Sequence, residues 1–418
     1  MVRDSGNPMK KLLLALLVVY GANLSLFSQK ADTVSIIPLS DSLLAGTKAD
    51  TVRQTDLVDF IVRIFKIKDS EERRNVRKIR FSLFPTRSAA GGDKTVFTSF
   101  NIAFLLGDLK DTKVSNIYFY PYIGFEGQYG FQIQPNIWLK KNSWNFIGEY
   151  FLLNYPQNTW GLGGNSPEEN LTLIDYDHFR IHQNVMRGIF PNFSIGLGYA
   201  YDKHYNIKVE ESDYSDVISG YMPEDKDYTV SSGITIPFMY DLRKNQLNPQ
   251  SGFMASLTYS FYDPIFGSDD KWQSLFIDSR KYFHFGGEKH KILAFRGYYW
   301  TIVSGNPPYL DLPANRWEPV PGSVSRGIRQ NRYRSNAMLY FETEYRFGIT
   351  ANGFLGGVVF ANVTSPSQYN TRQFSYWHPA GGTGIRLKFN KFSNTNVTFD
   401  FGFSKEFASV YVNIGEAF

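Results

Sequence analysis

The sequence predicts an all-β fold, a 16-stranded antiparallel transmembrane β-barrel with a short N-terminal helical segment, and three observations predict it. Residues 337–347 alternate without a break between apolar and polar side chains, which is the period of a strand with two unlike faces. Most predicted strands run about nine to eleven residues, the length that a tilted strand needs to cross a bilayer. Charges within the strands lie mostly on the polar side, and a Lys or Arg facing lipid at the midplane would cost about 2–4 kcal/mol.

Residues 1–28 are predicted to form a secretory signal peptide. Arg3, Lys10 and Lys11 supply the basic region, residues 12–20 supply the apolar core, and a cleavage position follows near Ser28. The alternative is a membrane anchor, but the apolar run is shorter than the roughly 20 residues that a spanning helix needs. No later segment is long enough to span as a helix, so insertion into a membrane is expected through strands.

Residues 29–77 are expected to be a periplasmic linker that carries one short amphipathic helix. Thr55 or Asp56 is placed to cap its start. Apolar side chains then recur at helical spacing, at Leu57, Phe60, Ile61, Ile64 and Phe65. Two interpretations stay open: the helix packs against the barrel, or it plugs the periplasmic mouth or docks a partner.

Residues 78–418 are predicted to form the outer-membrane barrel. Runs of alternating polarity separated by turn residues follow one another without intervening helices, which is typical of an all-β architecture. The sixteen predicted strands are residues 79–84, 96–105, 117–126, 131–140, 144–153, 178–185, 193–201, 230–240, 253–261, 273–283, 292–300, 337–347, 353–362, 381–389, 397–403 and 410–418.

The connections between these strands are of two kinds. Some are tight, such as residues 248–252, whereas others are long, such as residues 209–228 and 304–334. Short periplasmic turns and long outer loops are the arrangement of outer-membrane barrels. The last predicted strand ends on Phe418, which is expected to act as a C-terminal barrel-assembly signal.

Composition excludes several classes of function. The chain has no cysteine, which excludes a disulfide scaffold and thiolate metal sites. The net charge of +5 is small, and no basic tract suggests binding to nucleic acid. We expect no cofactor and no bound metal.

An enzymatic site is not expected. His178 and His182 lie four residues apart on one strand face, with Arg180 between them, whereas a metal site needs three or more convergent ligands. We therefore interpret them as part of a polar lumen wall. Ser194 and Ser231 have no adjacent histidine in the setting of a nucleophile, and no Gly-x-Ser-x-Gly elbow or phosphate-binding loop is found.

Three short motifs follow one another along residues 78–418. The first is residues 160–165, Trp-Gly-Leu-Gly-Gly-Asn, and the second is a hairpin built on Asp241, Arg243, Pro249 and Gly252. The third places Arg326 and Gly327 in a long loop before a strand that carries Glu-Tyr-Arg-Phe at residues 344–347. Their order and spacing resemble the BamA/TamA-type outer-membrane assembly and translocation barrels, also called bacterial surface antigen barrels. The resemblance implies that the loop folds into the lumen.

Two positions depart from the pattern of that family. Ile328 stands where the family loop carries an aromatic residue, and Asn362 stands where the next strand carries an acid that meets the loop arginine. A buried charge without its partner costs about 3–5 kcal/mol. We therefore predict that Arg326 anchors the loop through Glu342 and Glu344, with Asn362 as a neutral acceptor. The alternative is that all four loop arginines are solvated surface charges: Arg326, Arg329, Arg332 and Arg334.

The resemblance implies a non-enzymatic protein of a Gram-negative outer membrane, with a role in inserting or translocating proteins or lipids. The POTRA domains that receive client proteins in this family have no counterpart in the predicted segment before residue 78, so a separate periplasmic or outer-membrane protein partner is expected. Outer-membrane lipid and the barrel-assembly machinery that inserts the chain itself are the other expected partners. The alternative function is a passive or gated pore for small solutes, and a lipid hydrolase is a third.

Overall fold

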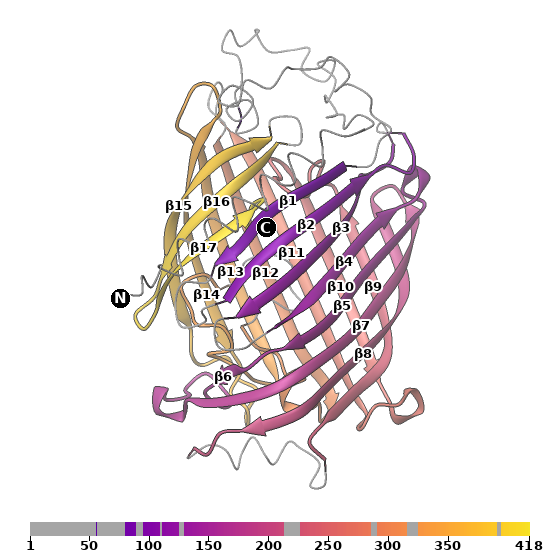
Figure 1. Cartoon of the computed structure of the whole chain (residues 1–418), viewed down its shortest axis with the longest axis vertical. Helices are drawn as coiled ribbons and strands as arrows, with labels where there is room; N and C mark the ends of the chain where they lie inside the picture. The colour runs from indigo at the N-terminus through magenta and orange to yellow at the C-terminus, as the bar shows by residue number, and fades with distance from the viewer. Residues whose placement is uncertain are drawn as a thin grey trace, which may run out of the picture.

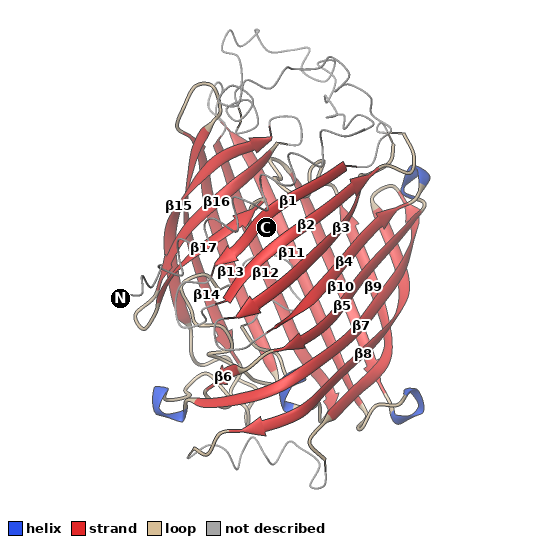
Figure 2. Ribbon diagram, in the orientation of Figure 1, coloured by secondary structure: helices blue, strands red, loops and turns tan. Residues whose placement is uncertain are grey.

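The computed structural model describes Asp56 and residues 80–88, 95–108, 111–124, 129–212, 226–285, 291–315, 325–390 and 394–418. Almost all regular structure in these residues is β (Figure 2). The helical elements described are single 3-10 turns, namely η3 (Lys140–Asn142), η4 (Glu168–Asn170), η5 (Pro264–Phe266) and η6 (Tyr309–Asp311). In this part of the chain no helix has the length and apolar character to cross a membrane. The predicted signal peptide and helix lie outside the described residues, apart from Asp56.

Seventeen strands form one antiparallel sheet in the described residues. They are β1 (Arg80–Ser88), β2 (Thr95–Phe104), β3 (Ser115–Gly124), β4 (Tyr129–Trp138), β5 (Trp144–Asn154), β6 (Gln157–Thr159), β7 (Thr172–Phe190), β8 (Phe193–Val209), β9 (Thr229–Asp241), β10 (Gly252–Tyr262), β11 (Trp272–Phe285), β12 (Lys291–Gly305), β13 (Ala337–Gly348), β14 (Leu355–Pro366), β15 (His378–Asn390), β16 (Thr395–Phe403) and β17 (Ala408–Ile414).

Consecutive strands pair with each other along the whole sheet, except that β5 pairs with β7 and the short β6 pairs only with the start of β7. The sheet curls into a barrel with strongly tilted strands (Figure 1). β17 comes to lie beside β1, although no residue pairs between them are present in the described parts of these two strands. The predicted count of sixteen is one too few, because sequence patterning did not detect the three-residue β6.

The two faces of the sheet differ in polarity, and β13 is the clearest example. Tyr340, Glu342 and Glu344 point inward and are buried, whereas Phe341 between them points outward and is 47% exposed. The same holds around the barrel, where large apolar side chains are exposed on the outside, including Phe179, Ile181, Leu197, Phe295, Val359, Ile385, Phe399 and Phe401. The predicted assignment of faces is confirmed for β13: charge lies inside and apolar surface lies outside.

The hairpin of β7 and β8 extends beyond its neighbours at the lower end of Figure 1, where β6 also lies. The prediction of a strand at residues 178–185 was therefore too short. In the extension the polarity is reversed: Ile174 and Tyr176 are buried on the inner face, whereas Asp175 and Asp177 lie on the outer parity. The predicted strand began at residue 178 because apolar side chains occupy the outer positions only from there on.

The long connections lie at the same end as β6, and the described parts of the β12–β13 connection fold into the lumen. Tyr309, Leu310 and Leu312 are buried against inward side chains of the wall, including Ile174, Tyr262, Trp272 and Ile302. Farther along the loop, Ile328 and Tyr333 pack against Tyr298, Trp300, Met338 and Tyr340. Apolar side chains of the loop thus give the barrel a packed interior.

The C-terminus corrects one expectation. β17 ends at Ile414, and Gly415, with φ 87°, turns the chain inward. Phe418 is buried inside the barrel against Tyr282 and Ile292. Phe418 is therefore not part of the last strand: its ring is buried, and its main-chain oxygen accepts a hydrogen bond from Arg346 Nη2 at 3.0 Å.

Candidate functional site: a buried arginine cluster in the lumen

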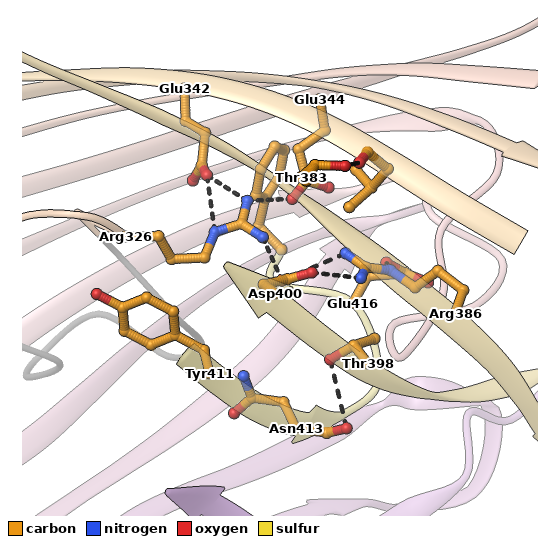
Figure 3. A network of polar contacts seen from close by, with 12 residues as sticks. Arg326, Glu342, Glu344, Thr383, Arg386, Thr398, Asp400, Tyr411, Asn413 and Glu416 are labelled. Atoms are coloured by element: carbon orange, nitrogen blue, oxygen red, sulfur yellow. Dashed lines mark hydrogen bonds and ion pairs between the residues drawn. The ribbon is translucent and has the colours of Figure 1, made fainter. Parts of the chain in front are cut away.

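Arg326 lies inside the barrel and is 0% exposed. Its guanidinium donates to Glu342 and Glu344 on β13 and to Asp400 on β16, and it lies 3.7 Å from the ring centroid of Phe360 (Figure 3). Tyr340 Oη in turn donates to Glu342 at 2.7 Å. An arginine suits this position because its planar guanidinium offers five donors in fixed directions, so one side chain can satisfy several carboxylates.

Two glycines allow the backbone next to Arg326 to approach β16: Gly327 in the loop and Gly402 on the strand. Gly327 has φ 91°, which disfavours side chains, and a Cβ there would lie 2.6 Å from the backbone nitrogen of Phe403. On the opposing strand, a Cβ on Gly402 would lie 2.8 Å from the Gly327 nitrogen. The Gly327 N–H donates to Tyr411 Oη at 3.0 Å. The backbone of the loop at Gly327 thus lies directly against the backbone of β16, next to Arg326.

The charges extend from Arg326 toward the C-terminus. Arg386 donates to Asp400 and, through Nε, to Glu416 at 2.7 Å, whereas Arg346 pairs with Glu344 at 2.6 Å. Burial by itself would raise the pKa of the Glu416 carboxyl, but Arg386 and then Arg346 outweigh it and hold that pKa below its ordinary value. Each carboxylate in this set therefore has a cationic partner, as buried charges require.

The structure brings Arg326, Glu342, Glu344 and Asn362 together, and it differs from the prediction in one detail. Asn362 Nδ2 donates to the Arg326 carbonyl at 2.9 Å, so it is a donor to the loop backbone and not an acceptor for the guanidinium. That Arg326 anchors the loop stays a prediction.

Asp400 is the residue that sequence reasoning missed. It occupies the inward position of β16 between the outward Phe399 and Phe401, whereas the prediction gave Arg326 only Glu342 and Glu344 as acidic partners. Its inward parity was visible in the sequence. What the sequence did not reveal is that β16 lies beside the loop, because this depends on how far the loop descends into the barrel.

Of the other three arginines of the loop, two are buried and one is partly exposed. Arg332 is buried and donates to the Ser166 carbonyl at 2.8 Å, and Arg334 is buried and donates to the Tyr309 carbonyl at 2.8 Å. The side chain of Arg329 is 40% exposed, 3.6 Å from Glu168. The alternative in which all four arginines are solvated is wrong for Arg326, Arg332 and Arg334.

The first sequence motif meets this loop. Gly163 donates its N–H to the Arg334 carbonyl at 2.8 Å, and the guanidinium carbon of Arg332 lies 5.4 Å from the Trp160 ring centroid. His378 Nε2 bonds to the Gly164 carbonyl at 3.0 Å, and its ring stacks on Tyr333. Residues 160–165 therefore form one side of the packing around the descending loop.

The hairpin motif lies at the other end of the barrel. Asp241 accepts from the Arg243 backbone N–H at 3.0 Å and from its Nε at 2.9 Å. Gly252, with φ 113°, passes close to the Leu242 carbonyl, and the Pro249 carbonyl lies 3.5 Å from Arg346 Nη1. The turn also contacts the C-terminal tail, since Glu416 donates its N–H to the Leu247 carbonyl at 2.8 Å.

Comparison with known proteins supports these observations at the level of the fold. No family model matches the chain, and no curated protein matches it in sequence. Among solved structures it is similar to BamA from Haemophilus ducreyi lacking POTRA domains 1–3, with 13% identity and a TM-score of 0.52 over 82% of this chain and 70% of that one. It is also similar to CdiB from Escherichia coli, with 9% identity and a TM-score of 0.52 over 82% and 68%.

The fold is that of a BamA-type barrel. The resemblance predicted from three motifs is thus confirmed for the architecture.

The histidines of β7 have a defined place in this barrel. His178 Nε2 lies 2.9 Å and His182 Nε2 lies 2.5 Å from the carboxylate of Asp202, which also accepts from Arg180 Nε. The described residues contain no group of three or more His, Cys, Asp or Glu arranged for a metal ion. Ser231 donates to Asp311 of η6 at 2.7 Å and so contacts the loop inside the lumen.

Proposed function

We propose that the chain is an outer-membrane barrel of the BamA/TamA-like assembly and translocation superfamily, which takes part in inserting or translocating outer-membrane proteins or lipids. The observation that carries the proposal is the placement of Arg326 against Glu342, Glu344 and Asp400 on the inner face of a BamA-type fold. The arginine anchors the loop in the lumen.

The proposed location follows from the polarity of the wall. Phe341, Ile385 and Phe399 belong to a continuous apolar exterior, and soluble monomers rarely expose apolar patches larger than a few hundred Å². Lipid contact removes that cost, and the reversed polarity of residues 172–177 fits a hairpin that leaves the bilayer for water. Residues 1–28 are then the cleaved signal, residues 29–77 a periplasmic linker, and residues 78–418 the barrel.

The seam between β1 and β17 is the proposed working part of the wall. β17 has seven residues, and the two strands lie side by side without residue pairs in their described parts. In the membrane these strands close a barrel of sixteen full strands, and a seam with few hydrogen bonds opens at lower cost than any other pair. Lateral opening there, together with local thinning of the bilayer, lets a client strand enter, supplied by a periplasmic or outer-membrane protein partner.

Insertion can be tested directly in vesicles. An unfolded outer-membrane barrel protein is added to phosphatidylcholine vesicles that contain the chain, and its folded, protease-protected fraction is followed with time. We expect faster insertion than into empty vesicles. A second variant carries a cysteine in β1 and another in β17, and crosslinking the two should remove the acceleration. Equal rates in loaded and empty vesicles would rule out the insertion role.

A passive pore is the alternative function, and the filled lumen argues against it. Tyr309, Leu310 and Leu312 are buried in the barrel interior, so the path for solutes is obstructed. The lipid-hydrolase interpretation has less support, because Ser231 contacts Asp311 and both β7 histidines contact Asp202.

A further inference from the structure

One connection at the long-loop end lies over the outside of the barrel. Residues 367–377 join β14 to β15, and the ring of Phe374 packs edge-on against Tyr299 of β12, with 6.3 Å between the ring centroids. Trp377 stacks on Phe341 of β13 at 6.5 Å. Tyr299 and Phe341 are on the outward parity of their strands, since their neighbours Tyr298 and Tyr340 are buried in the lumen. The loop therefore folds over the exterior of the wall.

Hydrogen bonds hold this loop in place. Arg372 Nη1 donates to the Ile302 carbonyl at 3.2 Å, and Ser335 Oγ donates to the Ser367 carbonyl at 2.6 Å. Within the loop, the Arg372 N–H donates to the Gln368 carbonyl at 2.8 Å. The connection is thus tied both to itself and to the ends of β12 and β13, so its aromatic side chains have defined positions.

Three of the side chains that this loop exposes are aromatic, and the others are polar or charged. Tyr369, Tyr376 and Trp377 are 40%, 39% and 48% exposed, and the exposed Arg372 lies among them in the chain. Amphipathic rings of Tyr and Trp prefer the boundary between headgroups and acyl chains, and a nearby cation is attracted to lipid phosphate. The loop also continues the apolar exterior of Phe341 and Val359. By contrast, the short β16–β17 turn at the same end exposes Lys405 and Glu406.

We propose that residues 367–377 form a membrane-interface anchor, in which Tyr369, Tyr376 and Trp377 enter the headgroup–acyl boundary of the bilayer and Arg372 meets lipid phosphate. The anchor rests on the proposed function, which puts the barrel wall in a membrane. Its consequence is specific: one outer loop lies in lipid, whereas the adjacent β16–β17 turn stays in water. The anchor fixes the depth and tilt of the barrel at β12–β14, a few strands away from the β1–β17 seam.

The absence of cysteine from the chain makes the test direct, because a single introduced cysteine can carry a fluorescent label. The probe position is Ser375→Cys, an exposed site that leaves all four rings in place. Phe399→Cys on the outward face of β16 is the lipid-facing reference, and Lys405→Cys is the aqueous reference. Each protein is reconstituted in phosphatidylcholine–phosphatidylglycerol vesicles, and the label is quenched by lipids brominated at shallow or deep acyl positions or by iodide in the buffer.

We expect the Ser375 label to be quenched by shallow bromolipid about threefold more than the Lys405 label and to be protected from iodide. Adding Trp377→Ala should move the Ser375 label toward the aqueous reference. Iodide quenching equal to that at Lys405, with Phe399 still quenched by lipid, would overturn the anchor and leave the barrel placement intact. Loss of lipid quenching at Phe399 as well would overturn both. Heat-modifiable mobility of each labelled protein verifies that it is folded.

Discussion

At the scale of the residue, the account depends on Arg326. Three carboxylates, Glu342, Glu344 and Asp400, converge on one guanidinium that water does not reach. Replacing such a pair by apolar groups can be neutral, but removing one member leaves uncompensated buried charge and costs about 3–5 kcal/mol. The folded barrel therefore depends on Arg326, because without the guanidinium the three carboxylates would be left buried and uncompensated.

Arg326→Ala is therefore expected to lower the folded stability of the barrel by about 3–5 kcal/mol, seen as a lower urea midpoint in detergent. Arg326→Lys should lose part of the same energy, because one ammonium cannot reach three carboxylates in the geometry of the guanidinium. The matched control is Arg329→Ala, since Arg329 is partly exposed and its ion pair with Glu168 contributes at most about 1 kcal/mol. Equal midpoints for Arg326→Ala and Arg329→Ala would contradict the anchor.

Gly327→Ala tests the backbone contact beneath the arginine. The new methyl group would lie 2.6 Å from the Phe403 backbone and would also strain a φ of 91°. Gly353→Ala is a matched control, because Gly353 has φ 69° but open space around its Cβ, so only the conformational cost of about 1–3 kcal/mol applies. We expect the urea midpoint to fall further for Gly327→Ala. Equal urea midpoints for the two variants would contradict a close backbone contact between the loop and β16.

At the scale of the element, the C-terminal tail differs most from a simple strand. Gly415 to Phe418 turn into the lumen, where Glu416 joins Arg386 and Phe418 packs on Tyr282. The alternating residues before Phe418 predicted a strand that continues to that residue. Nothing in the local sequence indicates that Gly415 turns the chain inward. A role for Phe418 as an assembly signal stays a prediction.

Glu416 is expected to make the folded stability depend on pH. Its folded pKa lies below the ordinary 4.5, so as pH falls the unfolded chain takes up the proton first. The contribution of Glu416 to stability is therefore complete above the ordinary value and is lost as pH falls through the folded pKa. We expect the urea midpoint to drop more between pH 7 and pH 3 for the wild type than for Glu416→Gln. Glu169→Gln, at an exposed position, should follow the wild type, and identical slopes for all three would contradict the assignment.

The strands show what local sequence determines and what it does not. Parity separated the side chains of β13 into two faces, because a strand repeats every two residues, but strand lengths and charges elsewhere in the chain were needed to predict which face points inward. The same rule predicted too short a strand for β7, since the apolar Ile174 and Tyr176 face inward where the polarity of the two faces reverses. It also missed β6, whose three residues are too few to show a period. Asp400 could be assigned a face but not a partner, because its contact with Arg326 joins parts of the chain 74 residues apart.

At the scale of the whole molecule, charge inside and apolar surface outside fit the proposed lipid exterior and a lumen into which the loop folds. The described parts of the β12–β13 loop contribute Tyr309, Leu312, Ile328 and Tyr333 to that interior. The three sequence motifs lie at two ends of the barrel: the first and the third meet around the loop, and the second, the hairpin of Asp241 and Gly252, contacts the C-terminal tail at the opposite end.

A filled lumen predicts little ion flow. In planar bilayers the wild type should show low or flickering conductance, and deletion of residues 306–334 should give larger, steadier steps. The control is Arg329→Ala, which should retain the wild-type record because its side chain is at the loop surface. Large steady steps from the wild type would favour the passive-pore interpretation.

The most direct test of the central claim is flotation of the mature chain, residues 29–418, after refolding with phosphatidylcholine vesicles on a density gradient. We expect the folded, heat-modifiable protein to float with the lipid and to stay there after a carbonate wash. A folded monomer that remains in the aqueous fractions without lipid or detergent would contradict it.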